Sequence, residues 1–507
     1  MKARTAVIAL LLLLTVASAG FGQQAARGRV VIAQGVDPRS MNPLEDNVGP
    51  ASNVYYHIFD ALVHRGQDMR PTPALAVSWK NIDPLTWEFK LRQGVKFHNG
   101  EDFTADDVKF TLDWITQPEQ SGAGWSYYIT PFYKDAQIID QYTVRIITKE
   151  PDPLFDSRMI IYHILPKDTF QRMGATQFRL TPVGTGPYKF VEWVKDDHIT
   201  VEANPSYWGG APTIKTVVFR PIPDPATRVA GLQTGEFDVI TNVPPERVPE
   251  ITRSSNLRVE TAPSIRIFFF AFNTRVPPFN DMRLRRAANY AVNKRAIING
   301  VMLGYAIQRS ATTSPGIAGH IRDLAPYPYD PARAKKLMAE AGFPNGFEFA
   351  LSAPRGRYVK DAEIAEAVAG QLAAVGIRAN LWIRPWTTFW ERYLSPAKKE
   401  FGDGAFMAGF GNTSLDSALT YSSLHRCGSP NGYYCSPKVD ALLEEAGRIV
   451  GNSAKRTQVL QQIERIVYDE AAWLFLFNPV DTYGVSNRLV WKASPDESIR
   501  MNWASLK

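Results

Sequence analysis

The chain has 507 residues, too many for one hydrophobic core, so two or three folding units are expected. A hydrophobic content of 45% and a charged content of 21% are ordinary for a globular protein. The formal net charge of +7 is modest and no basic tract concentrates it, which argues against a nucleic-acid-binding protein.

The first nineteen residues are predicted to be a cleavable signal peptide. Lys2 and Arg4 give a basic start, an apolar run follows from residue 6 to 16, and Ala17-Ser18-Ala19 offers the small residues that a signal peptidase needs. The run is too short to span a bilayer, and no cysteine follows the expected cleavage after Ala19. We expect export to the periplasm, with full secretion as the alternative, and neither membrane insertion nor a lipid anchor.

The next clear pattern combines a strand, a return and a helix. Residues 86–92, TWEFKLR, alternate between apolar and polar side chains and predict a strand, and GVKFHNG at 94–100 predicts a hairpin-like return. Thr104 is expected to cap a helix with Asp106 and Asp107 in its first turn, where carboxylates suit the helix dipole.

Two glycines at the stretch PVGTGPYKFVEW, residues 182–193, raise the question of a phosphate-binding loop. The pattern does not continue as GxGxxG, because Lys189 stands where the third glycine would fall. Apolar and polar residues then alternate, as in a strand. Gly184 and Gly186 are therefore predicted to shape a tight turn into a strand.

Helical patterns dominate the second half of the chain. Asn280 or Asp281 is expected to start one helix, and Asn293 to cap another that stops at Gly304. Apolar stripes predict further helices over residues 361–375 and 454–468. Because strands and helices mix throughout, the fold class is predicted to be α/β or mixed α+β.

The chemistry-bearing residues give no catalytic signature. The chain has no GxSxG elbow, no GxxxxGK loop and no HExxH pair. Cys427 and Cys435 are the only cysteines, and export favours a disulfide between them. A metal site that used both thiols and His425 is the weaker alternative, since it lacks a fourth ligand. The 12 Trp, 20 Tyr and 27 Phe predict large cores, an aromatic-lined cleft, or both.

Several blocks of sequence resemble the family 5 extracellular solute-binding proteins, which are the dipeptide-, oligopeptide- and nickel-binding components of ABC importers. The blocks follow one another in the expected order over nearly the whole chain. They are MNPL from Met41, IFDALV from Ile58, the run from Ser78 to Val108, VGTGPYKF from Val183, ANPSYWGGAP from Ala203, LQTGEFDVI from Leu232, the run from Phe272 to Ile298, and SPKVDALLEEA from Ser436.

This resemblance implies a periplasmic-binding-protein-like fold of type II, in which two lobes close on a ligand and the first lobe carries an inserted domain. Domain I would comprise residues 24–54, 178–265 and 479–507, domain II residues 55–177, and domain III residues 266–478. Crossings between the lobes would fall near 264–270 and 476–479, where strands can flex as hinges.

The resemblance also implies a function and its partners. The protein would bind a peptide or peptide-like solute and deliver it, without a cofactor, to two permease subunits with their ATPase subunits. It would act as a monomer. Receptors for a nickel chelate, an opine or a sugar-type solute are alternatives within this class. A secreted hydrolase is the alternative outside it, but Asp106 and Asp107 are adjacent on a helix and make a poor acid/base pair.

The resemblance also points to residues that would contact the ligand. In peptide-binding relatives, an aspartate after a Gly-Trp pair receives the ligand ammonium group. Here Phe410 replaces the tryptophan, and Asn412 or Thr413 stands near the place of the aspartate, with Asp416 soon after. Either Asp416 substitutes for it, or the ligand has no free amino terminus. Asp416 is equally expected to cap a helix.

Further candidates come from alignment with the same family. Trp386 stands where peptide-binding members place a pocket tryptophan, and Arg355 and Arg357 fall near a position that some relatives use for a ligand carboxylate. Tyr55, Trp125 and Tyr128, in domain II, are candidates for the other wall of the cleft. Asn273, which follows an expected hinge strand, is a candidate for hydrogen bonds to an extended ligand. For each of these residues a role in the core or on an exposed loop remains open.

Overall fold

The computed structural model describes residues 28–120, 124–394, 403–429, 432–449 and 453–507. The expected signal peptide, residues 1–19, and its cleavage site lie outside this part of the chain. Within the described ranges, no helix is long enough and apolar enough to cross a bilayer.

One large sheet runs through both lobes, and β18 (Trp473–Ser486) is its central strand. The first half of this sheet contains β1 (Arg29–Gln34), β8 (Tyr188–Val194), β9 (His198–Ala203), β10 (Thr216–Pro221), β11 (Val239–Ile240) and β12 (Leu257–Pro263). The second half contains β13 (Arg266–Phe272), β14 (Ala306–Gln308), β15 (Phe347–Arg355), β16 (Ile377–Pro385) and β17 (Asp403–Gly411). Their order is β16-β15-β17-β13-β18-β11-β1-β10-β9-β8, and β12 and β14 also pair with β18.

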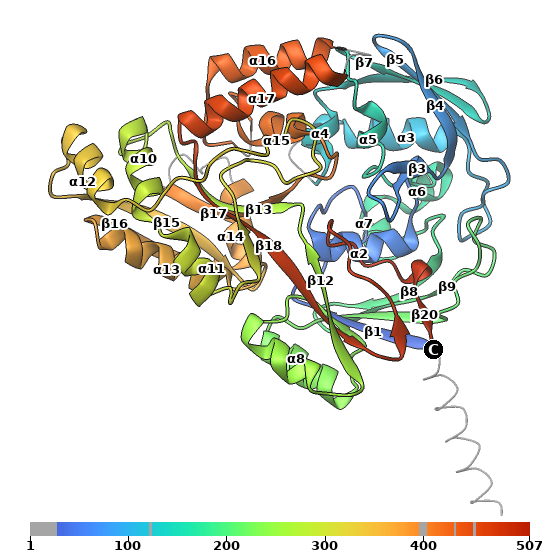
Figure 1. Cartoon of the computed structure of the whole chain (residues 1–507). Coiled ribbons are helices and arrows are strands. Elements are labelled where there is room, and N and C mark those ends of the chain that lie inside the picture. Colours follow the sequence, from blue (N-terminus) through green and yellow to red (C-terminus); the bar gives the residue numbers. More distant parts are fainter. Residues whose placement is uncertain (1–27, 121–123, 395–402, 430–431, 450–452) are drawn as a thin grey trace, which may run out of the picture.

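The two halves of the sheet meet where β18 changes partners. Its residues 473–477 pair with β13, and its residues 480–486 pair with β12. Figure 1 shows β18 running from the half with β13 and β17 to the half with β1 and β12. Ser264, between β12 and β13, donates its N–H to the carbonyl of Pro479 at 3.0 Å. The two strand crossings therefore lie side by side, which is a suitable arrangement for a hinge.

Helices cover the second half of the sheet and form the second lobe. They are α10 (Met282–Ala291), α11 (Lys294–Gly300), α12 (Pro331–Glu340), α13 (Asp361–Ala373), α14 (Trp386–Leu394), α15 (Ser417–Leu424), α16 (Pro437–Arg448) and α17 (Ser453–Asp469). The predicted caps Asp281 and Asn293 are confirmed. However, α11 ends at Gly300 and not at Gly304, because the chain turns through Leu303 and Gly304 with positive φ.

The first lobe combines the other half of the sheet with the inserted segment. α8 (Pro225–Thr234) and α9 (Val248–Thr252) pack on one face around a small apolar core. The inserted segment contains a four-stranded sheet with the order β4 (Ala76–Asp83), β5 (Thr86–Leu91), β7 (Thr143–Thr148) and β6 (Tyr133–Asp140). Buried side chains of this small sheet and of β1, β9 and β10 belong to one continuous core. The insert is therefore packed as part of the first lobe.

Shorter elements complete the first lobe. They are α2 (Gly49–Ile58), β2 (Val63–Arg65), β3 (Pro71–Pro73), α3 (Ala105–Ile115), α4 (Ser126–Ile129), α5 (Phe155–Arg158), α6 (Lys167–Met173), α7 (Ala175–Phe178), β19 (Leu489–Val490) and β20 (Ser505–Leu506). Thr104 caps α3 as predicted, in a capping box with Asp107. Asp106 forms an ion pair with Lys167, so both carboxylates of the hydrolase alternative have structural partners.

One buried carboxylate, Asp60, joins three of the sequence blocks. It accepts hydrogen bonds from the Thr185 hydroxyl at 3.0 Å, the Tyr207 hydroxyl at 3.0 Å and the Trp208 indole N–H at 2.8 Å. His64 lies 3.1 Å away. Burial alone would raise the pKa of Asp60, but the bonds from His64, Trp208 and Tyr207 hold it below its usual value. The motifs around Asp60, Thr185 and Tyr207 thus fasten the insert to the main sheet.

The two glycines of the same loop allow close backbone packing against α2. A Cβ at Gly184 would lie 2.0 Å from the carbonyl oxygen of Ile58, and one at Gly186 would lie 2.6 Å from that of His57. The Gly186 N–H donates to the Ile58 carbonyl at 2.9 Å, which satisfies the end of the helix. The glycine pair therefore serves as a turn into β8, as predicted, and also fixes the position of α2.

Replacing Gly184 by alanine is expected to destabilise the fold. The added methyl group would overlap the backbone of Ile58, and forced overpacking of this kind costs about 1–3 kcal/mol. Gly300→Ala is the matched control, because a Cβ there meets nothing within 4 Å and alanine favours the helix. Thermal unfolding of both variants tests this expectation. An unchanged midpoint for Gly184→Ala would contradict the packing described here.

Candidate functional site

A cavity of about 170 Å³ lies between the two lobes. Its first wall comes from α2 and from the segment 496–498 near the C-terminus, and its second from β13, β17, α14 and the loop after β15. Large aromatic side chains cover most of the surface, and these include Trp125, Phe269, Trp386, Trp390, Phe410 and Trp473. Such a lining favours burial of a small organic solute.

One face of α2 is turned toward the cavity. Gly49, Ser52, Asn53 and Tyr56 line it, and their spacing of three and four residues places them on the same side of the helix. The predicted Tyr55 lies on another face, fully buried, where its hydroxyl donates to the carbonyl of Ser40 at 2.6 Å. α2 begins at the cavity without a side-chain cap, so the positive end of its dipole faces the site.

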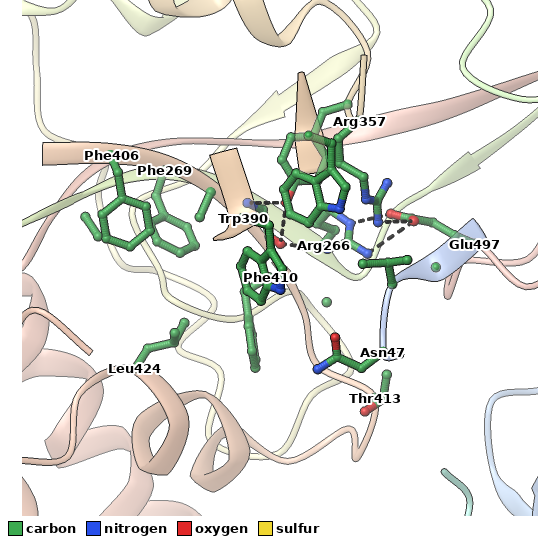
Figure 2. A pocket seen from close by; sticks show the side chains of 18 of the residues that line it. Asn47, Arg266, Phe269, Arg357, Trp390, Phe406, Phe410, Thr413, Leu424 and Glu497 are labelled. Carbon is green, nitrogen blue, oxygen red and sulfur yellow. Dashed lines mark hydrogen bonds and ion pairs between the residues drawn. The ribbon is translucent and has the colours of Figure 1, made fainter. Parts of the chain in front are cut away.

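Beside that helix end, two arginines share one glutamate. Arg266, the first residue of β13, binds both oxygens of Glu497 and also donates to the carbonyl of Gly409 at 2.6 Å. Arg357 reaches Glu497 only at 3.5 Å, through Nη2. Figure 2 shows the three side chains together at one end of the cavity. Arg266 is therefore fully engaged, whereas Arg357 is held by one long contact.

The guanidinium of Arg357 has donors to spare. Its side chain is 6% exposed, and its Nε is buried without a hydrogen-bond partner in the described residues. The group lies over the rings of Tyr358 and Trp386, with centroids at 4.8 Å and 5.9 Å. A Cβ on Gly49, the first residue of α2, would be 3.3 Å from its Nη2. A spare buried cation at a helix N-terminus is a site for an anion.

The charged groups around the Arg357 guanidinium carry more positive than negative charge. Burial would raise the pKa of Glu497, but Arg266 and Arg357 outweigh that effect and lower it to about 2. Burial, reinforced by the charge of Glu497, raises the pKa of nearby Asp481 well above its usual value. Arg266 and Arg357 therefore share the carboxylate of Glu497. An anionic ligand group would complete the balance.

Five of the predicted contact residues line the cavity: Trp125, Tyr128, Arg357, Trp386 and Thr413. Trp386 stacks on Trp390 with ring centroids 5.1 Å apart, on the second wall. Trp125 and Tyr128 come from the insert. Thr413 follows β17, and Figure 2 shows it and Asn47 in the lower part of the view, with Arg357 in the upper part.

Five others do not reach the cavity. Arg355 is exposed, and the buried Tyr55 and Asn273 are outside the lining. Asn412 is engaged within its own loop, donating to the carbonyl of Asp416 at 2.7 Å and to the Thr420 hydroxyl at 2.9 Å.

Asp416 has the alternative role that the sequence allowed. Its carboxylate caps α15 by accepting the N–H of Ala418 at 2.9 Å, and it forms a buried ion pair with Arg456. Because that pair already neutralises Asp416, and because the residue lies outside the lining, it does not supply a carboxylate to the cavity.

A disulfide closes a loop that contributes to the lining of the cavity. Cys427 and Cys435 are bonded to each other, and the loop between them brings Tyr433 to the lining, followed by Tyr434 just before the second cysteine. The hydroxyl of Tyr434 donates to Glu470 at 2.6 Å. Within the described residues, no group of histidine, cysteine, aspartate and glutamate side chains is arranged to hold a metal ion.

Comparison with known proteins identifies the class of protein to which this arrangement belongs. The family model described as bacterial extracellular solute-binding proteins, family 5 Middle, matches residues 70–433. This chain belongs to that family. It is therefore a solute-binding receptor of an ABC importer and not an enzyme, as the resemblance predicted.

Individual relatives support the same assignment. The glutathione-binding protein of Salmonella typhi is 28% identical over 457 residues, which cover 88% of each chain. The periplasmic binding protein DppA from Helicobacter pylori, in complex with the peptide STSA, is 26% identical with a TM-score of 0.86 over 96% of this chain and 99% of that one. The agropinic acid complex of AgaA from A. tumefaciens R10 has 23% identity and a TM-score of 0.85 over 95% and 99%, respectively. These matches confirm the predicted two-lobed α/β fold.

The paired arginines make the role of Glu497 measurable through pH. Its pKa in the folded protein is about 2, below the ordinary 4.5, so its contribution to stability is present above pH 4.5 and is lost as the pH falls toward 2. Glu497→Gln leaves both guanidinium groups without that partner, which should cost about 3 kcal/mol at neutral pH. The gap in unfolding midpoint between the wild type and this variant should shrink between pH 4.5 and 2.

The exposed Glu119 provides a matched control, since Glu119→Gln should leave the midpoint close to that of the wild type at each pH. A gap for Glu497→Gln that is constant from pH 7 to pH 2, or absent at pH 7, would contradict the proposed charge balance.

Proposed function

We propose that this chain is a periplasmic receptor for a small, peptide-like carboxylate, which it encloses between its lobes and delivers to the permease and ATPase subunits of an ABC importer. Export would remove residues 1–19 without leaving a lipid anchor, and the mature protein would act as a monomer. The observation that carries the proposal is Arg357, a buried guanidinium with unused donors beside the positive end of α2.

The size and lining of the cavity support a small ligand. An apolar cavity of about 150 Å³ holds one benzene-sized molecule, so 170 Å³ suits a small solute and not a long peptide. Aromatic walls would cover its apolar part, while Arg357 would pair with its carboxylate. Relatives bind glutathione and the peptide STSA, and a protein of the same fold holds agropinic acid, so peptide-like carboxylates recur among them.

The two lobes would close on the ligand because both of them supply contacts to it. Glu497 and α2 belong to the first lobe, whereas Arg357 follows β15 in the second. Lys360 and Glu246 form a further ion pair between the lobes at 2.5 Å. A solute that touches both walls binds the closed form more tightly than the open form, and this difference shifts the population toward closure. A shift from 1:99 to 99:1 needs about 5.5 kcal/mol, which micromolar binding of about 8 kcal/mol can supply.

The three domains expected from the sequence fit this scheme, and we propose one adjustment. A boundary between residues 54 and 55 would cut α2, which continues to Ile58. We therefore assign residues 28–58, 178–265 and 479–507 to domain I, residues 59–177 to domain II and residues 266–478 to domain III.

A solute with a free carboxylate should bind and stabilise the protein, whereas the C-terminal amide of the same solute should not. We expect thermal shifts with one or more members of a panel of acidic solutes (amino acids, dipeptides, N-acylated dipeptides, glutathione and opines) and none with the C-terminal amides of the same compounds. A solute at 100 times its Kd stabilises the folded state by about 2.7 kcal/mol. Solutes should be recovered unchanged. Equal shifts for acids and amides, or cleavage of a solute, would contradict the proposal.

Substitution of Arg357 should weaken the binding of any acid that stabilises the protein. Removing one member of a buried charge pair costs about 2 kcal/mol or more, so Arg357→Gln should raise the Kd by about 30-fold or more. Arg355→Gln is the matched control, because Arg355 belongs to the same segment and is exposed. Isothermal titration calorimetry measures the Kd of both variants. The same Kd for Arg357→Gln and the wild type would remove Arg357 from the site.

A further inference from the structure

The charged groups of the cavity indicate what the rest of the ligand must be. Four charged side chains line it within the described residues, namely Arg266, Arg357, Asp496 and Glu497. Both acids already have partners. Glu497 is held by the two arginines.

Asp496 is also engaged. It accepts hydrogen bonds from the Ser494 hydroxyl at 2.6 Å and from the Ser498 N–H at 3.1 Å, and its other oxygen lies 3.7 Å from Nε of Arg65. Arg65 is itself buried, so this carboxylate balances a cation of the protein. Among the described residues, the lining therefore offers a ligand one arginine with unused donors, and each of its two carboxylates already faces an arginine.

Asn47 and Thr413, which Figure 2 draws in the lower part of the view with Arg357 in the upper part, give the cavity a neutral polar end. Asn47 comes from the segment before α2 and Thr413 from the loop after β17. The Asn47 amide also donates to the carbonyl of Gly124 at 3.0 Å. An amide and a hydroxyl can each donate and accept hydrogen bonds but carry no charge. Asp416, three residues beyond Thr413, is directed to Arg456 and is outside the lining.

A free ammonium group would be unfavourable in this environment. Burial of an unpaired ion costs several kcal/mol, and the excess positive charge around Arg357 would add repulsion. The aromatic walls offer cation–π contacts, but these return only about 2 kcal/mol when desolvated. The cost of burying the ammonium group therefore exceeds the cation–π energy. An amide or a hydroxyl at the same place would form hydrogen bonds with neutral groups.

We propose that the cavity selects carboxylates whose nitrogen is uncharged, such as N-acylated amino acids and N-blocked peptides, and discriminates against solutes with a free amino terminus. This inference rests on the proposed function, in which Arg357 binds the carboxylate. It adds that Asn47 and Thr413 receive the neutral, acylated end of the same solute.

Isothermal titration of the full-length mature protein with Met-Leu and N-acetyl-Met-Leu tests the proposal, supplemented by free and N-acetylated forms of other dipeptides. The acetylated form should bind at least tenfold more tightly. Equal or tighter binding of the free dipeptides would overturn this inference and leave the proposed function intact. Absence of binding by either form, together with no thermal shift from any acid in the panel, would overturn the proposed function as well.

A charge placed at Thr413 should reverse the preference. Thr413→Asp puts a carboxylate at the neutral end, so the free dipeptide should gain at least tenfold relative to the acetylated one. Ser255→Asp adds the same charge at an exposed position before β12 and should keep the wild-type preference. An unchanged preference in a folded Thr413→Asp protein, as judged by its thermal unfolding, would overturn the placement of the acylated end beside Thr413.

Discussion

Arg357 is a buried cation for which the protein provides only part of a counter-charge. Removing a guanidinium from water is costly unless an anion or a set of hydrogen bonds compensates for it. Here Glu497 gives most of its bonding capacity to Arg266, and the Nε of Arg357 has no hydrogen-bond partner in the part of the chain that the structure describes. The favourable energy of completing the hydrogen bonds of Arg357 is gained only when a ligand anion binds. Because Glu497 and Arg357 belong to different lobes, the same contacts that bind the anion also hold the lobes together.

The sequence blocks around Asp60, Thr185 and Tyr207, which carry part of the family resemblance, support the cavity without lining it. Thr185, Tyr207 and Trp208 converge on Asp60, and the Gly184–Gly186 loop packs against the last turn of α2. Their shared effect is to hold α2, whose other face lines the cavity. These motifs therefore identify the scaffold of the family well but contain little information about which solute is bound.

The strands, helices and lobes could be predicted because they depend on local patterns. Thr104 and Asn293 cap helices through bonds to residues two or three positions away, and the alternation after Gly186 forms β8. Trp386, Arg357 and Thr413 could also be placed, because aligned family positions carried them into the cavity. The ion pair of Asp416 with Arg456 could not be predicted, since it joins residues forty positions apart in the sequence. Tyr56, and not the predicted Tyr55, lines the cavity, because it lies on the same face of α2 as Gly49 and Ser52.

Arg266 and Glu497 were missed for a similar reason. Arg266 had one sequence signal, a charge at the start of an otherwise apolar strand, but Glu497 lies in a loop whose position depends on the fold of the whole first lobe.

The most direct test of the account is native mass spectrometry of the protein purified from its own host, with the bound solute then released by denaturation. We predict an unmodified small carboxylate without a free amino group. Release of a solute that carries no carboxylate would contradict the central role given to Arg357.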